Sequence, residues 1–124
     1  MIQSRRLPDT ELEVMQVIWD CIPPVSVSDI SEKVYKIHPM AETTLQTILT
    51  RLSEKEFLDV SIQKRKKYYT PTISRKSYQI SQSRSFFQKV CGGKLSAFAN
   101  ALCEGGLTKE ELAQLRVLLE EDKL

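Results

Sequence analysis

The chain has 124 residues, of which 41% are hydrophobic and 27% are charged. These values are ordinary for a soluble globular protein, and the length predicts one compact domain or two small modules. No apolar run approaches the roughly 20 residues that a membrane-spanning helix needs. The N-terminal residues also lack the pattern of a secretory signal. We therefore expect a cytoplasmic protein that has no membrane partner.

Residues that could support catalysis or metal binding are few. His38 is the only histidine, and the three cysteines, Cys21, Cys91 and Cys103, have no C-x-x-C spacing. Such a set does not form a zinc site, and no phosphate-binding loop or nucleophile motif occurs. We expect no enzyme activity, no metal and no cofactor. The cysteines are expected to be reduced and mostly buried, with a redox switch through Cys91 and Cys103 as the alternative.

Charge is distributed unevenly along the chain, although the net charge is only +2. Residues 1–59 hold ten acidic and six basic side chains, whereas residues 60–103 hold nine basic side chains and no acidic one. Residues 104–124 are acidic again, with six acids and three bases. A basic middle between acidic ends is either a solvated surface or the contact surface for a polyanion. The neighbouring elements favour the polyanion.

The N-terminal segment predicts two helices. Asp9 or Thr10 can cap the first helix, and Thr10 with Glu13 fits a capping box. The helix ends before the prolines at 23–24. Ser26 opens the second helix, which ends at His38 because a proline follows. Helical spacing predicts the buried side chains of the two helices: Leu12, Met15, Ile18 and Trp19, then Val27, Ile30, Val34 and Ile37.

A third helix, over residues 43–54, has an unusual polar face. Its narrow apolar stripe consists of Leu45, Ile48, Leu49 and Leu52. The opposite face holds Thr43, Gln46, Thr47, Thr50, Arg51 and Glu54. Threonine lowers helix propensity, so a purely solvated face would more often hold Glu and Lys. Short hydroxyls, an amide and an arginine are groups that reach base edges and phosphates in a major groove, although this helix alone leaves the two interpretations even.

After the third helix the apolar period changes from helix to strand. Leu58, Val60 and Ile62 alternate with polar residues, which predicts a half-buried strand. Lys64, Arg65, Lys66 and Lys67 form a basic tip, and strand-forming residues follow at 68–70. Three helices and a basic hairpin are typical of a winged helix-turn-helix, whose third helix enters the major groove while the wing contacts the backbone. We thus expect a mainly α fold with a small β-hairpin wing, over residues 1–73.

The remaining residues, 74–124, predict a separate domain of three helices. Ser74 opens the first helix, which ends near Gly92-Gly93, and Thr108 with Glu111 forms a capping box for the last. The apolar residues expected to make a dimer are Phe86, Phe87, Val90, Leu95, Phe98, Leu102, Leu112, Leu115 and Leu119. Such a short segment cannot hide all of them in its own core, so we expect burial against a second copy. The alternative is packing against the winged helix of the same chain.

Several segments together resemble a known family. The stretch E-L-E-V-M-Q-V-I-W at 11–19 is similar to its first helix, and T-L-Q-T-I-L-T-R-L at 44–52 to its recognition helix. Y-T-P at 69–71 resembles the end of its wing, and residues 86–95 resemble its first dimerisation helix. On these motifs the chain is identified as similar to the penicillinase, methicillin-resistance and copper-responsive repressors (BlaI/MecI/CopY). The resemblance covers nearly the whole chain.

This resemblance implies a homodimeric transcriptional repressor that binds a palindromic operator in double-stranded DNA. The residues that it places against DNA are Thr43, Thr44, Gln46, Thr47, Arg51 and the wing residue Arg65. To these the polar face and the basic tip add Thr50, Lys64 and Lys66. The two alternatives are a thiol-responsive DNA-binding regulator and a winged-helix module for protein contacts.

The chain also departs from the family pattern. Members that respond to beta-lactams are cleaved at an Asn-Phe bond in the dimerisation arm, which implies a sensor protease as a further partner; here Ala101-Leu102 takes that position. The paired C-x-C motifs of copper-responsive members are absent. Lys64 stands where relatives often have glycine, and Ala41 replaces a common capping serine before the recognition helix.

Overall fold

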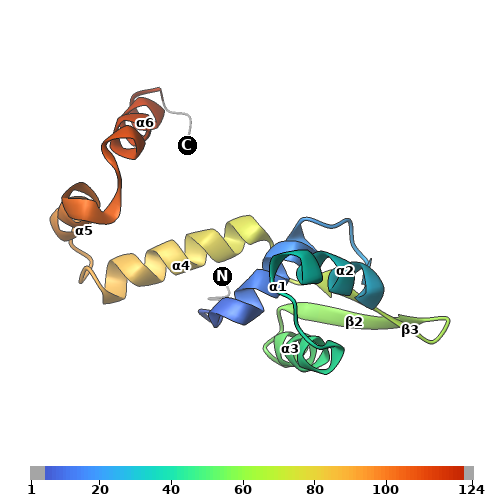
Figure 1. Cartoon of the computed structure of the whole chain (residues 1–124). Helices are drawn as coiled ribbons and strands as arrows, with labels where there is room; N and C mark the ends of the chain where they lie inside the picture. The colour runs from blue at the N-terminus through green and yellow to red at the C-terminus, as the bar shows by residue number, and fades with distance from the viewer. Residues whose placement is uncertain (1–4, 122–124) are drawn as a thin grey trace. The chain divides into compact units, whose positions relative to one another are not determined.

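The chain forms two compact units that divide between Ser81 and Gln82. The computed structural model describes residues 5–121 (Figure 1). The first unit contains three helices and a small sheet, and the second contains short helices. The sequence predicted a boundary after residue 73, eight residues before the division in the structure.

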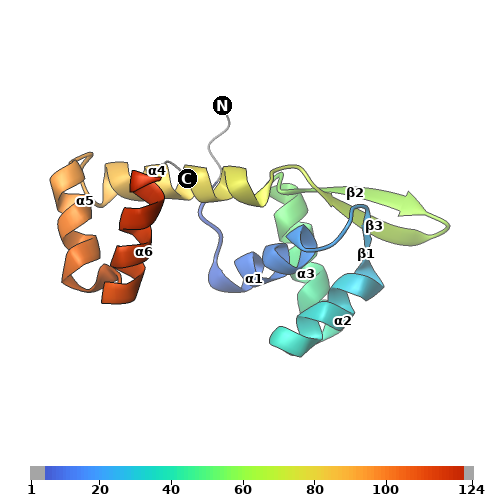
Figure 2. The same ribbon diagram turned by 90° about the horizontal axis from the view of Figure 1, so that it is seen from above.

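The first unit has the order of elements that the sequence predicted for a winged helix-turn-helix. Its elements are α1 (Asp9–Trp19), β1 (Val25–Ser26), α2 (Val27–Ile37), α3 (Glu42–Glu54), β2 (Leu58–Gln63) and β3 (Lys66–Pro71). The strands form one antiparallel sheet in the order β1-β3-β2, so β3 is central (Figure 2). The short strand β1 was not predicted, because two residues carry no periodic signal.

Of the caps predicted for α1 and α2, one is confirmed and one is wrong. Ser26 caps α2 as predicted, since its Oγ accepts a hydrogen bond from the Asp29 backbone N–H at 3.2 Å. The capping box at Thr10 is wrong, because α1 begins one residue earlier with Pro8 in the N-cap position. Helix α3 begins after Ala41 without any side-chain cap.

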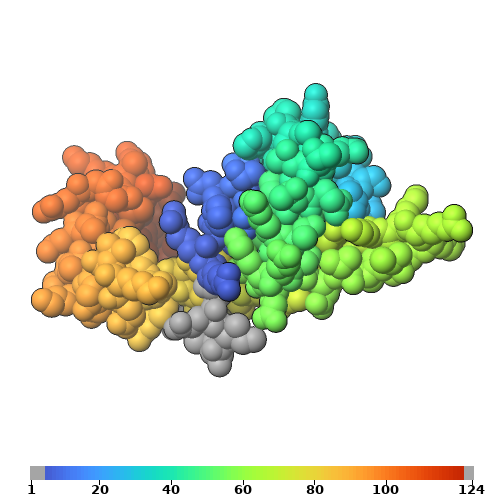
Figure 3. All heavy atoms as spheres, turned by 90° about the horizontal axis from the view of Figure 1, so that it is seen from below, coloured from blue at the N-terminus to red at the C-terminus, as the bar shows by residue number. Residues whose placement is uncertain are grey.

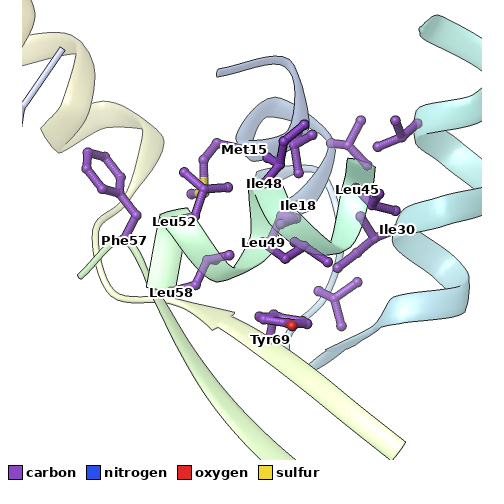
Figure 4. Close-up of a cluster of buried hydrophobic side chains, with 14 of the residues drawn as sticks. Met15, Ile18, Ile30, Leu45, Ile48, Leu49, Leu52, Phe57, Leu58 and Tyr69 are labelled. Atoms are coloured by element: carbon purple, nitrogen blue, oxygen red, sulfur yellow. The ribbon is translucent and has the colours of Figure 1, made fainter. Parts of the chain in front are cut away.

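The apolar stripe of α3 is the centre of the hydrophobic core. All four predicted side chains, Leu45, Ile48, Leu49 and Leu52, are buried. They pack in one cluster with Met15 and Ile18 of α1, Ile30 of α2 and Leu58 and Tyr69 of the sheet (Figure 4). Three elements thus hold α3 from one side, which fixes which of its faces remains bare.

Three side chains that the sequence predicted as buried are exposed instead. Leu58 of β2 is buried, but Val60 is 44% and Ile62 is 69% exposed, so the prediction of a half-buried strand is wrong. The β2–β3 hairpin projects away from the three helices of the winged unit (Figure 2), and the exposed fraction of its apolar residues rises from Leu58 to Ile62. Ile37, the last residue of α2, is also exposed because it lies beyond the packed turns of that helix.

The start of α4 (Arg75–Lys89) belongs to the winged unit. Tyr78 is buried there, with its ring 5.7 Å from that of Trp19 and 5.8 Å from that of Phe57. Its hydroxyl accepts a hydrogen bond from the Leu7 backbone N–H at 2.9 Å. These contacts explain why the first compact unit extends past residue 73. The predicted cap is confirmed, since Ser74 Oγ accepts from the Ser77 N–H.

The second unit contains the end of α4, α5 (Leu95–Ala101), the π-helical turn η1 (Leu102–Gly106) and α6 (Lys109–Glu120). Helix α4 stops where predicted, because Gly92 and Gly93 both adopt a positive φ that favours glycine. The predicted capping box is confirmed: Glu111 N donates to Thr108 Oγ1 and Thr108 N donates to Glu111 Oε1.

Replacing Tyr78 by alanine tests its role in closing the core of the winged unit. We expect Tyr78→Ala to lower the free energy of unfolding by roughly 3 to 5 kcal/mol, as other buried aromatic truncations do. Denaturant titration of the full chain measures this loss. Gln79→Ala, at the exposed next position, is the control and should change stability by less than about 0.5 kcal/mol. Equal stability of the two variants would contradict the assigned role.

Candidate nucleic-acid interface

The bare face of α3 forms a continuous polar surface. Six side chains line one shallow depression on it: Thr43, Gln46, Thr47, Thr50, Arg51 and Glu54. These are the six that the helical period placed opposite the apolar stripe. Figure 3 shows α3 at the surface, with the hairpin projecting beside it. The structure therefore brings together five of the residues predicted to contact DNA, with Glu54 at the C-terminal end of the helix.

The threonines of this surface are held in fixed orientations. Thr47 Oγ1 donates a hydrogen bond to the Thr43 carbonyl at 3.0 Å, and Thr50 Oγ1 donates to the Gln46 carbonyl at 2.9 Å. Such bonds to the preceding turn use the hydroxyl hydrogen. Each side chain then offers an oxygen lone pair and a methyl group outward. Exposed amino groups of adenine or cytosine and the thymine methyl are matching partners in a major groove.

Gln46 is tied to the sheet by a contact that the sequence analysis missed. Its Nε2 donates a hydrogen bond to the Tyr69 hydroxyl at 3.3 Å. Gln46 is half-buried, whereas Tyr69 is buried in the core on the central strand. The two residues are 23 positions apart and lie on different elements, so no local pattern could have indicated the pair.

Some of the basic side chains have structural partners within the winged unit. Lys55 forms an ion pair with the buried Glu11, with 2.6 Å between Nζ and Oε1. Arg75 lies over the Trp19 ring and forms an ion pair with Asp20 at 2.8 Å. Arg75 belongs to residues 60–103, the stretch without acidic side chains that suggested a polyanion partner. Not every basic side chain of that stretch is therefore free to bind a polyanion.

The basic residues of α3 and the hairpin are arranged differently. Arg51, Lys64, Arg65, Lys66 and Lys67 are all exposed. Across residues 5–121, none of these five side chains forms an ion pair with an acidic residue. Uncompensated positive charge beside a polar helix face is the electrostatic arrangement that attracts phosphates.

The tip of the hairpin is a strained turn of two residues. Gln63 pairs with Lys66, so only Lys64 and Arg65 connect the strands. Both have positive φ, 51° and 66°, which the mirror-image type I turn requires and which glycine or asparagine adopts more easily. Lys66 and Lys67 are the first residues of β3 and are not part of the tip, contrary to the prediction. Non-glycine residues kept in such a conformation suggest a functional use of their side chains.

Two further predictions concern the start of α3. Thr44 is exposed on its first turn but does not line the depression formed by the other residues. Ala41 provides no side-chain cap, as its substitution for serine suggested. The free N–H groups of an uncapped first turn are suited to hydrogen bonding with a phosphate oxygen.

The second unit exposes much apolar surface. Of the residues predicted to make a dimer, Phe86, Val90, Leu95 and Leu119 are exposed, and Phe87, Phe98, Leu102, Leu112 and Leu115 are half-buried. The Phe98 ring lies 6.1 Å from that of Phe86 and 5.9 Å from that of Phe87. Among residues 82–121, Cys91 alone is buried.

The cysteines are free, and their exposure differs from the expectation of mostly buried thiols. Cys91 is buried, Cys21 is half-buried and Cys103 is exposed. Cys21 Sγ donates to the Val17 carbonyl and accepts from Lys33 Nζ.

No helix within residues 5–121 is long and apolar enough to cross a membrane.

A winged helix-turn-helix with an exposed polar third helix and a basic wing is typical of DNA-binding transcriptional regulators. Residues 7–121 match the family described as penicillinase repressor. The chain belongs to this family, as its sequence motifs predicted.

Individual relatives agree with this assignment. The chain is 33% identical to a penicillinase repressor of Bacillus licheniformis, over 95% of this chain and 92% of that protein. It is 27% identical to the methicillin resistance regulatory protein MecI of Mammaliicoccus sciuri, over 94% of this chain and 95% of the relative. A solved structure of monomeric BlaI from Bacillus licheniformis, in complex with the blaP half-operator, aligns with a TM-score of 0.54 and 32% identity. That alignment covers 63% of this chain and 94% of the solved one.

Replacing Lys64 and Arg65 at the wing tip by uncharged residues that favour the same turn tests whether their charge contributes to DNA binding. We expect Lys64→Asn with Arg65→Gly to leave the hairpin at least as stable, because this dipeptide favours the observed turn. Affinity for every DNA sequence should fall, and the slope of log affinity against log salt should decrease by about two.

The matched control exchanges the two residues, Lys64→Arg with Arg65→Lys, and keeps both charges. Fluorescence anisotropy with labelled duplexes over a salt series gives the slopes of both variants. An unchanged slope in the uncharged variant would exclude the wing from phosphate contact.

Proposed function

We propose that this protein is a homodimeric transcriptional repressor that binds a palindromic operator. Its α3 helices would enter successive major grooves, with half-site centres about 10 base pairs apart or at a multiple of that spacing. The wing would contact the adjacent backbone. One observation is central: the leucine side of α3 is buried, and the opposite side presents polar groups next to basic side chains that form no ion pair within residues 5–121.

The relatives support DNA as the partner. The solved BlaI structure is a complex with a half-operator, and it aligns with 63% of this chain. Base edges would be contacted by Thr43, Gln46, Thr47, Thr50 and Arg51, and phosphates by Thr44, Lys64, Arg65 and Lys66. Occupation of promoter DNA by the bound protein is then sufficient for repression.

The second unit supports a homodimer. Forty or so residues rarely form a stable core alone, and within residues 82–121 only Cys91 is buried. Phenylalanines and leucines that remain exposed or half-exposed need cover, and a symmetric pair of copies is the commonest arrangement that supplies it. We therefore assign dimerisation to residues 82–124. A sensor protease as a partner stays a prediction, and Ala101-Leu102 differs from the Asn-Phe pair that is cleaved in family members.

The two alternative functions would use different features of the molecule. A module for protein contacts has no need for a bare polar helix beside an unpaired basic hairpin. A thiol-responsive regulator would use Cys91 and Cys103, of which one is buried and the other exposed. Operator affinity measured under reducing and then oxidising conditions distinguishes a thiol response from a simple repressor.

Replacing Arg51 by alanine tests sequence-specific DNA binding. If its guanidinium makes a bidentate contact with guanine, Arg51→Ala should weaken binding to the selected operator by roughly 1 to 3 kcal/mol. Binding to random duplexes should change far less. The control Lys109→Ala removes an equal, exposed charge from α6 and should leave both affinities unchanged. Equal losses on operator and random DNA would instead make Arg51 a phosphate contact.

Truncation after residue 81 tests the role of the second unit. The fragment keeps Tyr78 in its place, so it should remain folded, and it should sediment as a monomer while the full chain sediments as a dimer. Its operator affinity should fall by about 10²- to 10⁴-fold, because two linked half-sites bind more tightly than one. A shorter fragment, ending at residue 72, should be destabilised since it lacks Tyr78. A dimeric 1–81 fragment would refute the assignment.

A further inference from the structure

Tyr69 lies where it can control a side chain of the DNA-contacting helix. It is 1% exposed and sits on β3, the central strand of the sheet. Val25 of β1 and Val60 of β2 are its register partners on either side. Val25 and Tyr69 are buried in the same cluster, together with Leu49 of α3, so packing restricts the Tyr69 ring. The position of its hydroxyl is therefore restricted by the packing of the ring.

This hydroxyl meets the amide of Gln46. The Gln46 Nε2 atom donates a hydrogen bond to it at 3.3 Å. The backbone below is also tied, because Thr50 Oγ1 donates to the Gln46 carbonyl. A glutamine on an exposed helix face otherwise has several rotatable bonds and no preferred orientation of its amide. Here one amide hydrogen is directed inward, toward the protein.

The remaining groups of the Gln46 amide then form a defined pattern. If Tyr69 accepts the hydrogen that is trans to Oε1, the N–H cis to Oε1 and the Oε1 acceptor remain available side by side. Adenine presents the complementary pair in the major groove, an N6 amino donor beside the N7 acceptor, and glutamine binds it through two hydrogen bonds. Guanine presents two acceptors there, one of which would face Oε1. An amide fixed in this way favours adenine.

We propose that Tyr69 is a positioning residue for base recognition, which orients the Gln46 amide so that it contacts an adenine in each half-site. The proposal rests on the proposed function, since it requires that α3 enters the major groove. Tyr69 itself does not reach DNA, because it is buried. A residue of the sheet thus influences specificity at a base pair that α3 contacts.

The test compares Tyr69→Phe, Gln46→Ala and the double variant of the full chain on an operator selected with the wild-type protein. Each base pair of the half-site is replaced in turn, and the discrimination at every position is measured by anisotropy. Gln46→Ala should lose about 5- to 150-fold discrimination at one A·T position. Tyr69→Phe should lose about 2- to 12-fold at that same position, the worth of one hydrogen bond. The double variant should match Gln46→Ala alone.

Tyr68→Phe is the matched control, because it removes the same atom from the neighbouring residue of β3. Successive side chains of a strand point to opposite faces, so Tyr68 lies away from Gln46. This variant should discriminate as the wild type does. Thermal unfolding shows whether Tyr69→Phe keeps its fold, and its salt slope should stay at the wild-type value.

A second measurement uses the wild-type protein and does not depend on any variant folding. Replacing the adenine by 7-deazaadenine removes the N7 acceptor and should weaken binding at the Gln46 position alone. If Tyr69→Phe discriminates like the wild type, or if no adenine loses affinity on removal of N7, the positioning role is refuted while the repressor assignment stands. A wild-type protein without salt-dependent DNA binding would refute the repressor assignment itself.

Discussion

Burial of one face of α3 is the constraint on which the rest of the winged unit depends. Leu49 and Leu52 have no exposed surface, and Leu45 and Ile48 have very little. Burying a side chain of this size contributes about 1.5 to 3 kcal/mol, so rotation of α3 about its axis would be opposed by several such losses together. The helix therefore has one stable orientation. Its polar face is directed outward as a consequence of core packing, independently of any ligand.

The sequence predicted the elements whose signals are local. The period of the α3 stripe, the Ser26 cap and the Thr108–Glu111 box all depend on residues within one or two turns, and all are confirmed. The contacts that complete the molecule are not local. Tyr78 enters a core made by residues far from it in the chain, and β1 exists only because β3 lies beside it. The exposure of Ile62 depends on how far the hairpin extends past α3, which alternation alone does not reveal.

The candidate site shows the same division between local and distant information. Helical periodicity selected the outward-facing residues of α3, because a face is set by the helix alone. It could not show which charges have partners: Arg75 is paired with Asp20 across 55 positions, whereas Arg51 is not paired in the described part of the chain. A count of basic residues therefore overstates the surface that is open to a polyanion. Only the structure distinguishes basic side chains that form ion pairs within the protein from those that remain open to a ligand.

The Gln46–Tyr69 hydrogen bond links the two parts of the winged unit that would meet DNA. Tyr69 is on β3, and β3 is also one strand of the wing, so the hairpin and the recognition helix share a polar contact in addition to their apolar packing. A hydrogen bond to a buried, fixed partner has a smaller entropic cost than one between two mobile side chains, since only one of them must be ordered. Preorganised groups bind more tightly and discriminate better for the same reason. Specificity in this protein would then depend on the sheet as well as on the helix, and a change in the core beneath the wing would alter the choice of a base that the wing does not touch.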